Sequence, residues 1–164
     1  MNFTNWQPWL SRNKLGEILR YPGIYVVRLC SETAPENLSF QWAEDVIYVG
    51  MTNSVAGLKG RLAQFDETMR TPRVTHGGAD RVRLKHQDYN HFASSAYVAV
   101  CHVVCDVTSN RPDDLKLMGK VAELEYLALA IYVEKFGRLP EFNNKKATKK
   151  FSKTTEQRFP RGRG

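Results

Sequence analysis

The stretch "PGIYVV" at residues 22–27 joins a turn signal to a run of β-branched and aromatic residues, and "VIYVG" at residues 46–50 nearly repeats it. Valine, isoleucine and tyrosine favour extended backbone, so both runs are predicted to be strands. The loop between them predicts an antiparallel, hairpin-like pair. Each strand holds one phenol among apolar neighbours, Tyr25 in the first and Tyr48 in the second. The rest of the chain decides whether these phenols only fill a core or serve a site.

Further periodic segments surround this pair. Strand propensity predicts three strands in all, over residues 23–30, 45–52 and 94–107. Apolar residues at helical spacing predict three helices, over residues 9–20, 53–70 and 112–136. The third strand is almost continuously apolar, so we expect it to be central in its sheet. Residues 71–90 are polar and rich in turn signals, and we expect them to be irregular.

These elements predict an α+β protein with a small central three-stranded, mostly antiparallel sheet flanked by helices. The 164 residues, 42% of them hydrophobic and 25% charged, suit one globular domain. We assign residues 1–144 to that domain, with residues 1–20 as an N-terminal helical extension and residues 145–164 as a basic, flexible tail. Such an architecture does not identify a function.

The net charge of +7 is concentrated at the C-terminal end. Residues 145–164 hold eight lysines and arginines and one acid, whereas the other 144 residues hold 16 basic and 16 acidic groups. Basic tails bind nucleic acid by neutralising phosphates; the alternative is a solvated end that only aids solubility. The residues predicted to contact nucleic acid are Lys59, Lys145, Lys146, Lys149 and Lys150.

Other features exclude several protein classes. No stretch approaches the roughly 20 apolar residues of a membrane span, and the N-terminus lacks the pattern of a secretory signal. A cytoplasmic location is therefore expected. The three cysteines lie in apolar runs and are expected to be reduced, and no cysteine or histidine spacing matches a zinc site.

Glu125 is the least expected residue of the long predicted helix. Its neighbours three and four positions away on either side are all apolar, so it projects from the buried face. Burying an unpaired carboxylate is costly, so Glu125 requires a cation, a cleft, or an arginine such as Arg61 or Arg138. Glu123 has a surface-like setting in which a pair with Lys120 is sufficient, and it is the weaker candidate.

Three more polar residues are candidates for a site, each with a plainer alternative. Arg61 suits a phosphate with its guanidinium fork, or is a surface arginine. His76 is followed by two glycines that allow close approach of a ligand, or is simply exposed. Asn143 follows "LPEF" and serves the site, or forms an Asx turn. Together with two phenols and a carboxylate able to bind Mg²⁺, they suit hydrolysis of a phosphodiester.

The order of these residues resembles the GIY-YIG nuclease family over roughly residues 21–144. Gly23-Ile24-Tyr25 matches the first part of its motif, and Tyr48-Val49-Gly50 matches the second with valine for isoleucine. The family's helix arginine, metal-binding glutamate and late asparagine match Arg61, Glu125 and Asn143. Departures are Met51 and Phe65, where some members have lysine and histidine, and a longer gap between Glu125 and Asn143.

The resemblance implies a DNA endonuclease that uses one Mg²⁺ or Mn²⁺ ion and no small-molecule cofactor. Tyr48 would activate the attacking water, and Tyr25 would orient it or share that role. Arg61 would bind the scissile phosphate, Glu125 would hold the metal, and Asn143 would position Glu125 or the phosphate. His76 would bind phosphate or help proton transfer. The alternatives are a catalytically inactive nucleic-acid-binding domain of the same fold, and an interaction domain whose tail contacts an acidic protein.

Overall fold

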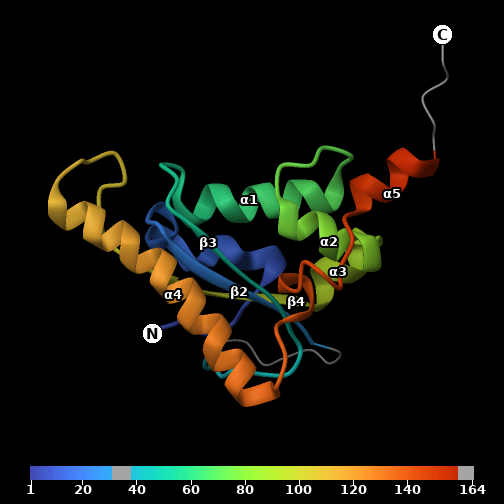
Figure 1. Cartoon of the computed structure of the whole chain (residues 1–164), viewed down its shortest axis with the longest axis horizontal. Coiled ribbons are helices and arrows are strands. Elements are labelled where there is room, and N and C mark those ends of the chain that lie inside the picture. Colours follow the sequence, from blue (N-terminus) through green and yellow to red (C-terminus); the bar gives the residue numbers. More distant parts are fainter. Residues whose placement is uncertain (31–37, 159–164) are drawn as a thin grey trace, which may run out of the picture.

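The fold is an open antiparallel sheet with helices on both faces (Figure 1). It is seen in a computed structural model that describes residues 1–30 and 38–158. The strand order is β1-β4-β2-β3. The strands are β1 (Gln7–Pro8), β2 (Gly23–Leu29), β3 (Val46–Thr52) and β4 (Ala96–His102). The expectation of three strands was wrong by one, because the two residues of β1 are too few to give a strand pattern.

The three predicted strands lie where their apolar residues place them. β2 and β3 form the expected antiparallel pair. β4 is shorter than the predicted 94–107, but it pairs with β1 and β2, which confirms its central position. The long helix α4 (Pro112–Phe136) also has its predicted bounds, with proline in its first turn and Gly137 ending it at a φ of 69°.

The other helices are η1 (Trp9–Arg20), α1 (Gly57–Arg70), α2 (Gly77–Lys85), α3 (Tyr89–Ser95), η2 (Glu141–Asn143) and α5 (Phe151–Arg158). The expectation that residues 71–90 are irregular was wrong, since α2 and the start of α3 lie there. Both are short helices that begin at side-chain caps, His76 for α2 and Asp88 for α3. No helix among the described residues is long and apolar enough to span a membrane.

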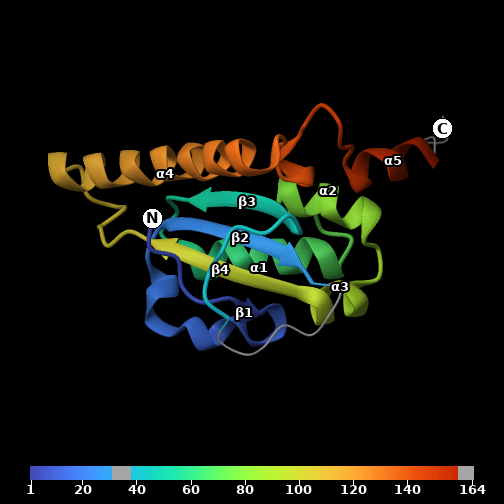
Figure 2. The same ribbon diagram turned by 90° about the horizontal axis from the view of Figure 1, so that it is seen from below.

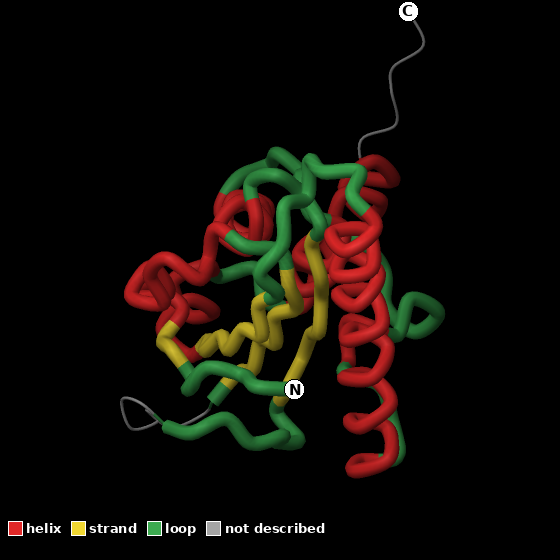
Figure 3. Tube along the Cα trace, turned by 90° about the vertical axis from the view of Figure 1, so that its left-hand side faces the viewer, coloured by secondary structure: helices red, strands yellow, loops and turns green. Residues whose placement is uncertain are grey.

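The alternation of side chains along β2 divides the core into two layers. Tyr25 and Val27 face η1, α1 and α2. Ile24 and Val26 face α4, which lies over β3 in Figure 2 and alongside the strands in Figure 3. Because β3 is the edge strand, its outer side is where groups from the two layers can meet.

Asp66 of α1 ties the N-terminal segment to the domain. Its buried carboxylate accepts hydrogen bonds from Trp9 Nε1 at 2.8 Å and from the Tyr89 hydroxyl at 2.7 Å. Arg12 and Arg70 pair with its other oxygen at 3.4 and 2.8 Å. Burial opposes the charge, yet these partners together hold the pKa of the Asp66 carboxyl below its ordinary value. These contacts hold η1, the helical part of the predicted N-terminal extension, against the rest of the domain.

We expect Asp66→Asn to lower the free energy of unfolding by about 3 kcal/mol, because the new amide places a donor against two guanidinium groups. Urea denaturation followed by tryptophan fluorescence measures this. Asp113→Asn is the matched control: its carboxylate is exposed and meets only Lys116 at 3.6 Å, so no measurable change is expected. Equal stability of both variants would show that the Asp66 network does not hold η1.

Candidate functional site

A cavity of about 510 Å³ opens at the outer edge of β3. Its walls come from both layers, with Tyr48 from β3, Arg81 from α2 and Glu125 from α4. Lys145 and Lys146 line it from the segment after η2. The cavity thus brings a phenol, a carboxylate and three cations to one place, which is the composition needed to bind an anion beside a reactive group.

The two motif tyrosines occupy different depths. Tyr48 is partly exposed and lines the cavity, whereas Tyr25 is completely buried behind it. Both phenols were expected to serve the reacting phosphate, but of the two only Tyr48 lies where it could contact one. Two glycines make room for the rings: a Cβ on Gly50 would lie 2.5 Å from the Tyr25 hydroxyl, and one on Gly78 would overlap the Tyr48 ring. The glycine of "YVG" is required by this close approach.

His76 is buried at the start of α2, and its proton position follows from its partners. Its Nδ1 accepts hydrogen bonds from the amides of Gly78 at 3.1 Å and Ala79 at 3.0 Å. Burial, with the charge of Arg61 adding to it, lowers the pKa of His76 to about 3. The ring is therefore neutral, and its single proton is on Nε2. A surface position and direct phosphate contact, two of the expectations for His76, do not fit a side chain that is 1% exposed. Its expected help in proton transfer stays a prediction.

The tautomer of His76 fixes the direction of its hydrogen bond to Tyr25. Nε2–H of His76 donates to the Tyr25 hydroxyl oxygen, with 2.5 Å between the nitrogen and the oxygen. The rings of Tyr25 and Tyr48 are neighbours, with their centroids 6.0 Å apart. Burial is the main influence on both phenols, so the pKa of Tyr25 is well above its ordinary value and that of Tyr48 is also raised. Of the two, Tyr48 is the phenol that reaches the cavity.

Arg61 supplies positive charge to the whole cluster. Its Nη1 donates to Gln64 at 3.2 Å, whereas its buried Nε has no hydrogen-bond partner among the described residues. Its charge favours ionisation of both phenols and of Glu125. Arg61 is only half-buried, so it is neither a plain surface arginine nor a member of the cavity wall.

Glu125 and Glu123 are separated as the sequence predicts. Glu123 is exposed and pairs with Lys120 at 2.8 Å. Glu125 is half-buried in the cavity wall and, within residues 1–30 and 38–158, makes neither a hydrogen bond nor an ion pair. Burial raises the pKa of its carboxyl, which the charges of Lys145 and Arg61 offset only in part. Arg138, one of its possible partners, instead lies 3.7 Å from Glu44.

The donor set fits a metal bound by one carboxylate. No group of three or more histidine, cysteine or acidic side chains exists among the described residues, so Glu125 would be the single protein ligand. Mg²⁺ retains several waters and is commonly held by one or two carboxylates together with substrate phosphates. A free carboxylate at the mouth of a cationic cavity meets that requirement.

Asn143 has a structural role that the sequence did not predict. Its side-chain oxygen accepts from the Val49 amide and its side-chain nitrogen donates to the Val49 carbonyl, both at 2.8 Å. The amide therefore acts as a further rung at the free edge of β3, which would otherwise leave these backbone groups unpaired. Both of its side-chain hydrogen bonds go to Val49, and although it lines the same cavity as Glu125 it makes no hydrogen bond to that carboxylate. The Asx turn is made by Asn144.

Arg81 is the cationic residue of the cavity that sequence reasoning missed, because α2 was not predicted. The signal was present: a capping residue, His76, precedes two glycines and an apolar Val82 that is fully buried. Among the predicted phosphate contacts, Lys145 and Lys146 line the cavity and are exposed. Lys59 is exposed on the first turn of α1 and lines no part of this cavity.

We expect the buried, neutral His76 to make the protein sensitive to acid. Its folded-state pKa is about 3 against about 6.5 in the unfolded chain. Below pH 6.5 the unfolded chain binds a proton that the folded chain does not, so stability falls with pH down to about pH 3. His76→Asn keeps an acceptor for the α2 amides but cannot titrate. Between pH 8 and pH 5 the parent should lose about 2 kcal/mol more than the variant, and parallel denaturation curves would contradict this.

Comparison with protein-family models, with curated proteins and with solved structures found no match. The resemblance to the GIY-YIG nucleases therefore stays a prediction from the sequence. What the site does is inferred from its own geometry.

Proposed function

We propose that this protein is a divalent-metal-dependent DNA endonuclease that hydrolyses phosphodiester bonds in the manner of the GIY-YIG nucleases. The observation that carries the proposal is the half-buried Glu125, which has no hydrogen-bond or ion-pair partner in the described part of the chain and lines a cavity together with Tyr48 and three cations. A structural carboxylate would be paired, because leaving it unpaired is costly. A metal and a phosphate would supply the missing partners.

The residues divide into those that touch the substrate and those that position them. Tyr48 faces the cavity and accepts the proton of the attacking water once its own proton is lost. Tyr25 and His76 are positioning residues, since they hydrogen-bond each other and both of their rings contact the Tyr48 ring. Arg61 stabilises the Tyr48 phenolate, while Arg81 and Lys145 bind the phosphate.

In the proposed hydrolysis, each bond formed or broken and each proton moved has a donor and an acceptor. A water oxygen forms a bond to phosphorus, its proton passes to the Tyr48 oxygen, and the bond from phosphorus to the leaving sugar oxygen breaks. The leaving oxygen takes a proton from solvent. Bound Mg²⁺, held by Glu125, would neutralise charge on the phosphoryl oxygens and lower the pKa of a bound water. The protein positions the phosphate and the phenol around that centre.

Glu125→Gln is expected to lower Mg²⁺-dependent cleavage of duplex or branched DNA more than about 100-fold, because it removes the charge that holds the metal. Glu123→Gln is the control at the same helix and should retain cleavage. Single-turnover assays on labelled DNA, with folding checked by circular dichroism, measure both. If the two variants cleave equally well, Glu125 is not the metal ligand.

A parent protein that binds DNA but cleaves none with Mg²⁺ or Mn²⁺ would support the second function, a nucleic-acid-binding module without catalysis. The raised pKa of Tyr48 favours that alternative, since the phenol is protonated at neutral pH without a bound metal. A protein that binds no DNA or RNA at low salt would contradict both functions.

The cleavage rate is expected to rise with pH because Tyr48 acts in its ionised form and its pKa lies above the ordinary value of about 10. Between pH 7 and pH 9 the rate should increase by up to about tenfold per pH unit. Tyr48→Phe should remove both the activity and this dependence. A pH-independent rate in the parent would exclude Tyr48 as the base.

A further inference from the structure

The segment after η2 is anchored to α2 by a buried carboxylate. Asp80 is fully buried and accepts hydrogen bonds from the Ser152 amide at 3.1 Å and the Ser152 hydroxyl at 2.7 Å. One turn further along α2, the guanidinium of Arg83 lies over the Phe151 ring at 4.7 Å. Asp80 also caps the start of α5, whose first amides have no partner within the helix. This part of the predicted flexible tail is therefore a docked element (Figures 1 and 2).

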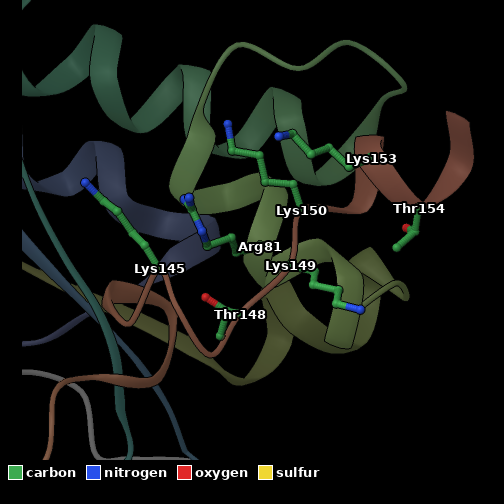
Figure 4. A pocket seen from close by; sticks show the side chains of 7 residues that line it. All are labelled: Arg81, Lys145, Thr148, Lys149, Lys150, Lys153 and Thr154. Atoms are coloured by element: carbon green, nitrogen blue, oxygen red, sulfur yellow. The ribbon is translucent and has the colours of Figure 1, made fainter. Parts of the chain in front are cut away.

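Docking creates a cavity of about 330 Å³ between α2 and the docked segment. Its lining residues, all basic or hydroxyl-bearing, are Arg81, Lys145, Thr148, Lys149, Lys150, Lys153 and Thr154 (Figure 4). Within the described part of the chain, none of the five cations forms an ion pair, and Arg81 Nε is buried without a partner. Like charges held this close repel one another, so the docked arrangement favours a bound anion.

The positions of the cations agree with one anion-binding site. In Figure 4 the nitrogen ends of Lys145, Arg81, Lys150 and Lys153 point toward the same side, whereas Lys149 points the other way. The Lys150 ammonium lies close to the start of α2, 3.5 Å from where a Cβ on Gly77 would be.

We propose that this cavity is a second phosphate site, which binds a backbone phosphate of the same nucleic-acid strand next to the one that reaches Tyr48 and Glu125. The inference rests on the proposed function, because it is the strand in the candidate active site that would occupy the cavity. Arg81 and Lys145 belong to both cavities, so the two sites adjoin. The docked segment would set the position of the strand, and its contribution depends on its docked structure as well as on its charge.

Two double variants of equal charge test the site by equilibrium binding to a short duplex in EDTA, where no cleavage occurs. Lys150→Ala with Lys153→Ala removes two lining cations, and Lys14→Ala with Lys116→Ala removes two exposed lysines outside both cavities. We expect the first pair to weaken binding about tenfold near 150 mM salt and to reduce the slope of log K against log salt by about 1. The second pair should change neither.

Ser152→Pro distinguishes a docked binding site from a tail that contributes only its charge. Proline removes the amide and the hydroxyl that bond Asp80 while leaving every charge in place, and it is tolerated in the first turn of a helix. We expect this variant to lose affinity as the Lys150 and Lys153 pair does, with the thermal stability of the domain retained. An unchanged affinity would overturn the docked site and leave only a charged tail.

The outcomes keep this inference distinct from the nuclease proposal. If the lining pair binds like its control while the parent cleaves DNA, the second site is wrong and the endonuclease stands. If binding responds as expected but no metal supports cleavage, the second site stands and the catalytic assignment fails. If the parent binds no nucleic acid at low salt, both fail.

Discussion

The complete burial of the Tyr25 hydroxyl is the constraint on which the site depends. A buried hydroxyl must be hydrogen-bonded, and its partner is a histidine whose other nitrogen is occupied by two backbone amides. That arrangement fixes the start of α2 against the sheet and holds the Tyr25 ring beside that of Tyr48. Gly50 and Gly78 follow from the same packing, because side chains there would overlap the phenol rings. A local packing requirement thus positions Tyr48, the motif phenol that faces the cavity.

The free edge of β3 is the second feature that shapes the site. An edge strand leaves backbone groups unpaired, and here the Asn143 amide closes one rung of that edge. The same connection places Lys145 and Lys146 beside Glu125, which arrives from the opposite layer on α4. The cavity therefore forms where the two layers meet at the end of the sheet. The edge strand β3 supplies the phenol, α4 supplies the carboxylate, and the segment after η2 supplies two lysines.

Charge is distributed so that the cavity is cationic although the body of the chain is neutral. Arg81 comes from the body, whereas the lysines that line the cavity come from the basic C-terminal segment. Asp80 brings the two together, because its buried carboxylate accepts the hydrogen bonds of the Ser152 amide and hydroxyl, which water would otherwise accept. The tail that composition describes only as basic is ordered through residue 158 as α5. Its position beside α2 is what makes its charge relevant to the candidate site.

The sequence by itself determined three of the four strands, the long helix and the separate settings of Glu123 and Glu125, because these depend on local propensity and on which face a residue occupies. It also selected Tyr48 and Arg61 by their order along the chain. Only the tertiary structure decided that Tyr25 and His76 are buried behind the cavity and that Asn143 pairs with Val49. It also decided that Arg81 of α2 and the docked tail line the candidate site. Those outcomes depend on contacts between residues up to 94 positions apart, which no local pattern encodes. The physical reason is that burial and hydrogen-bond pairing are properties of the packed chain.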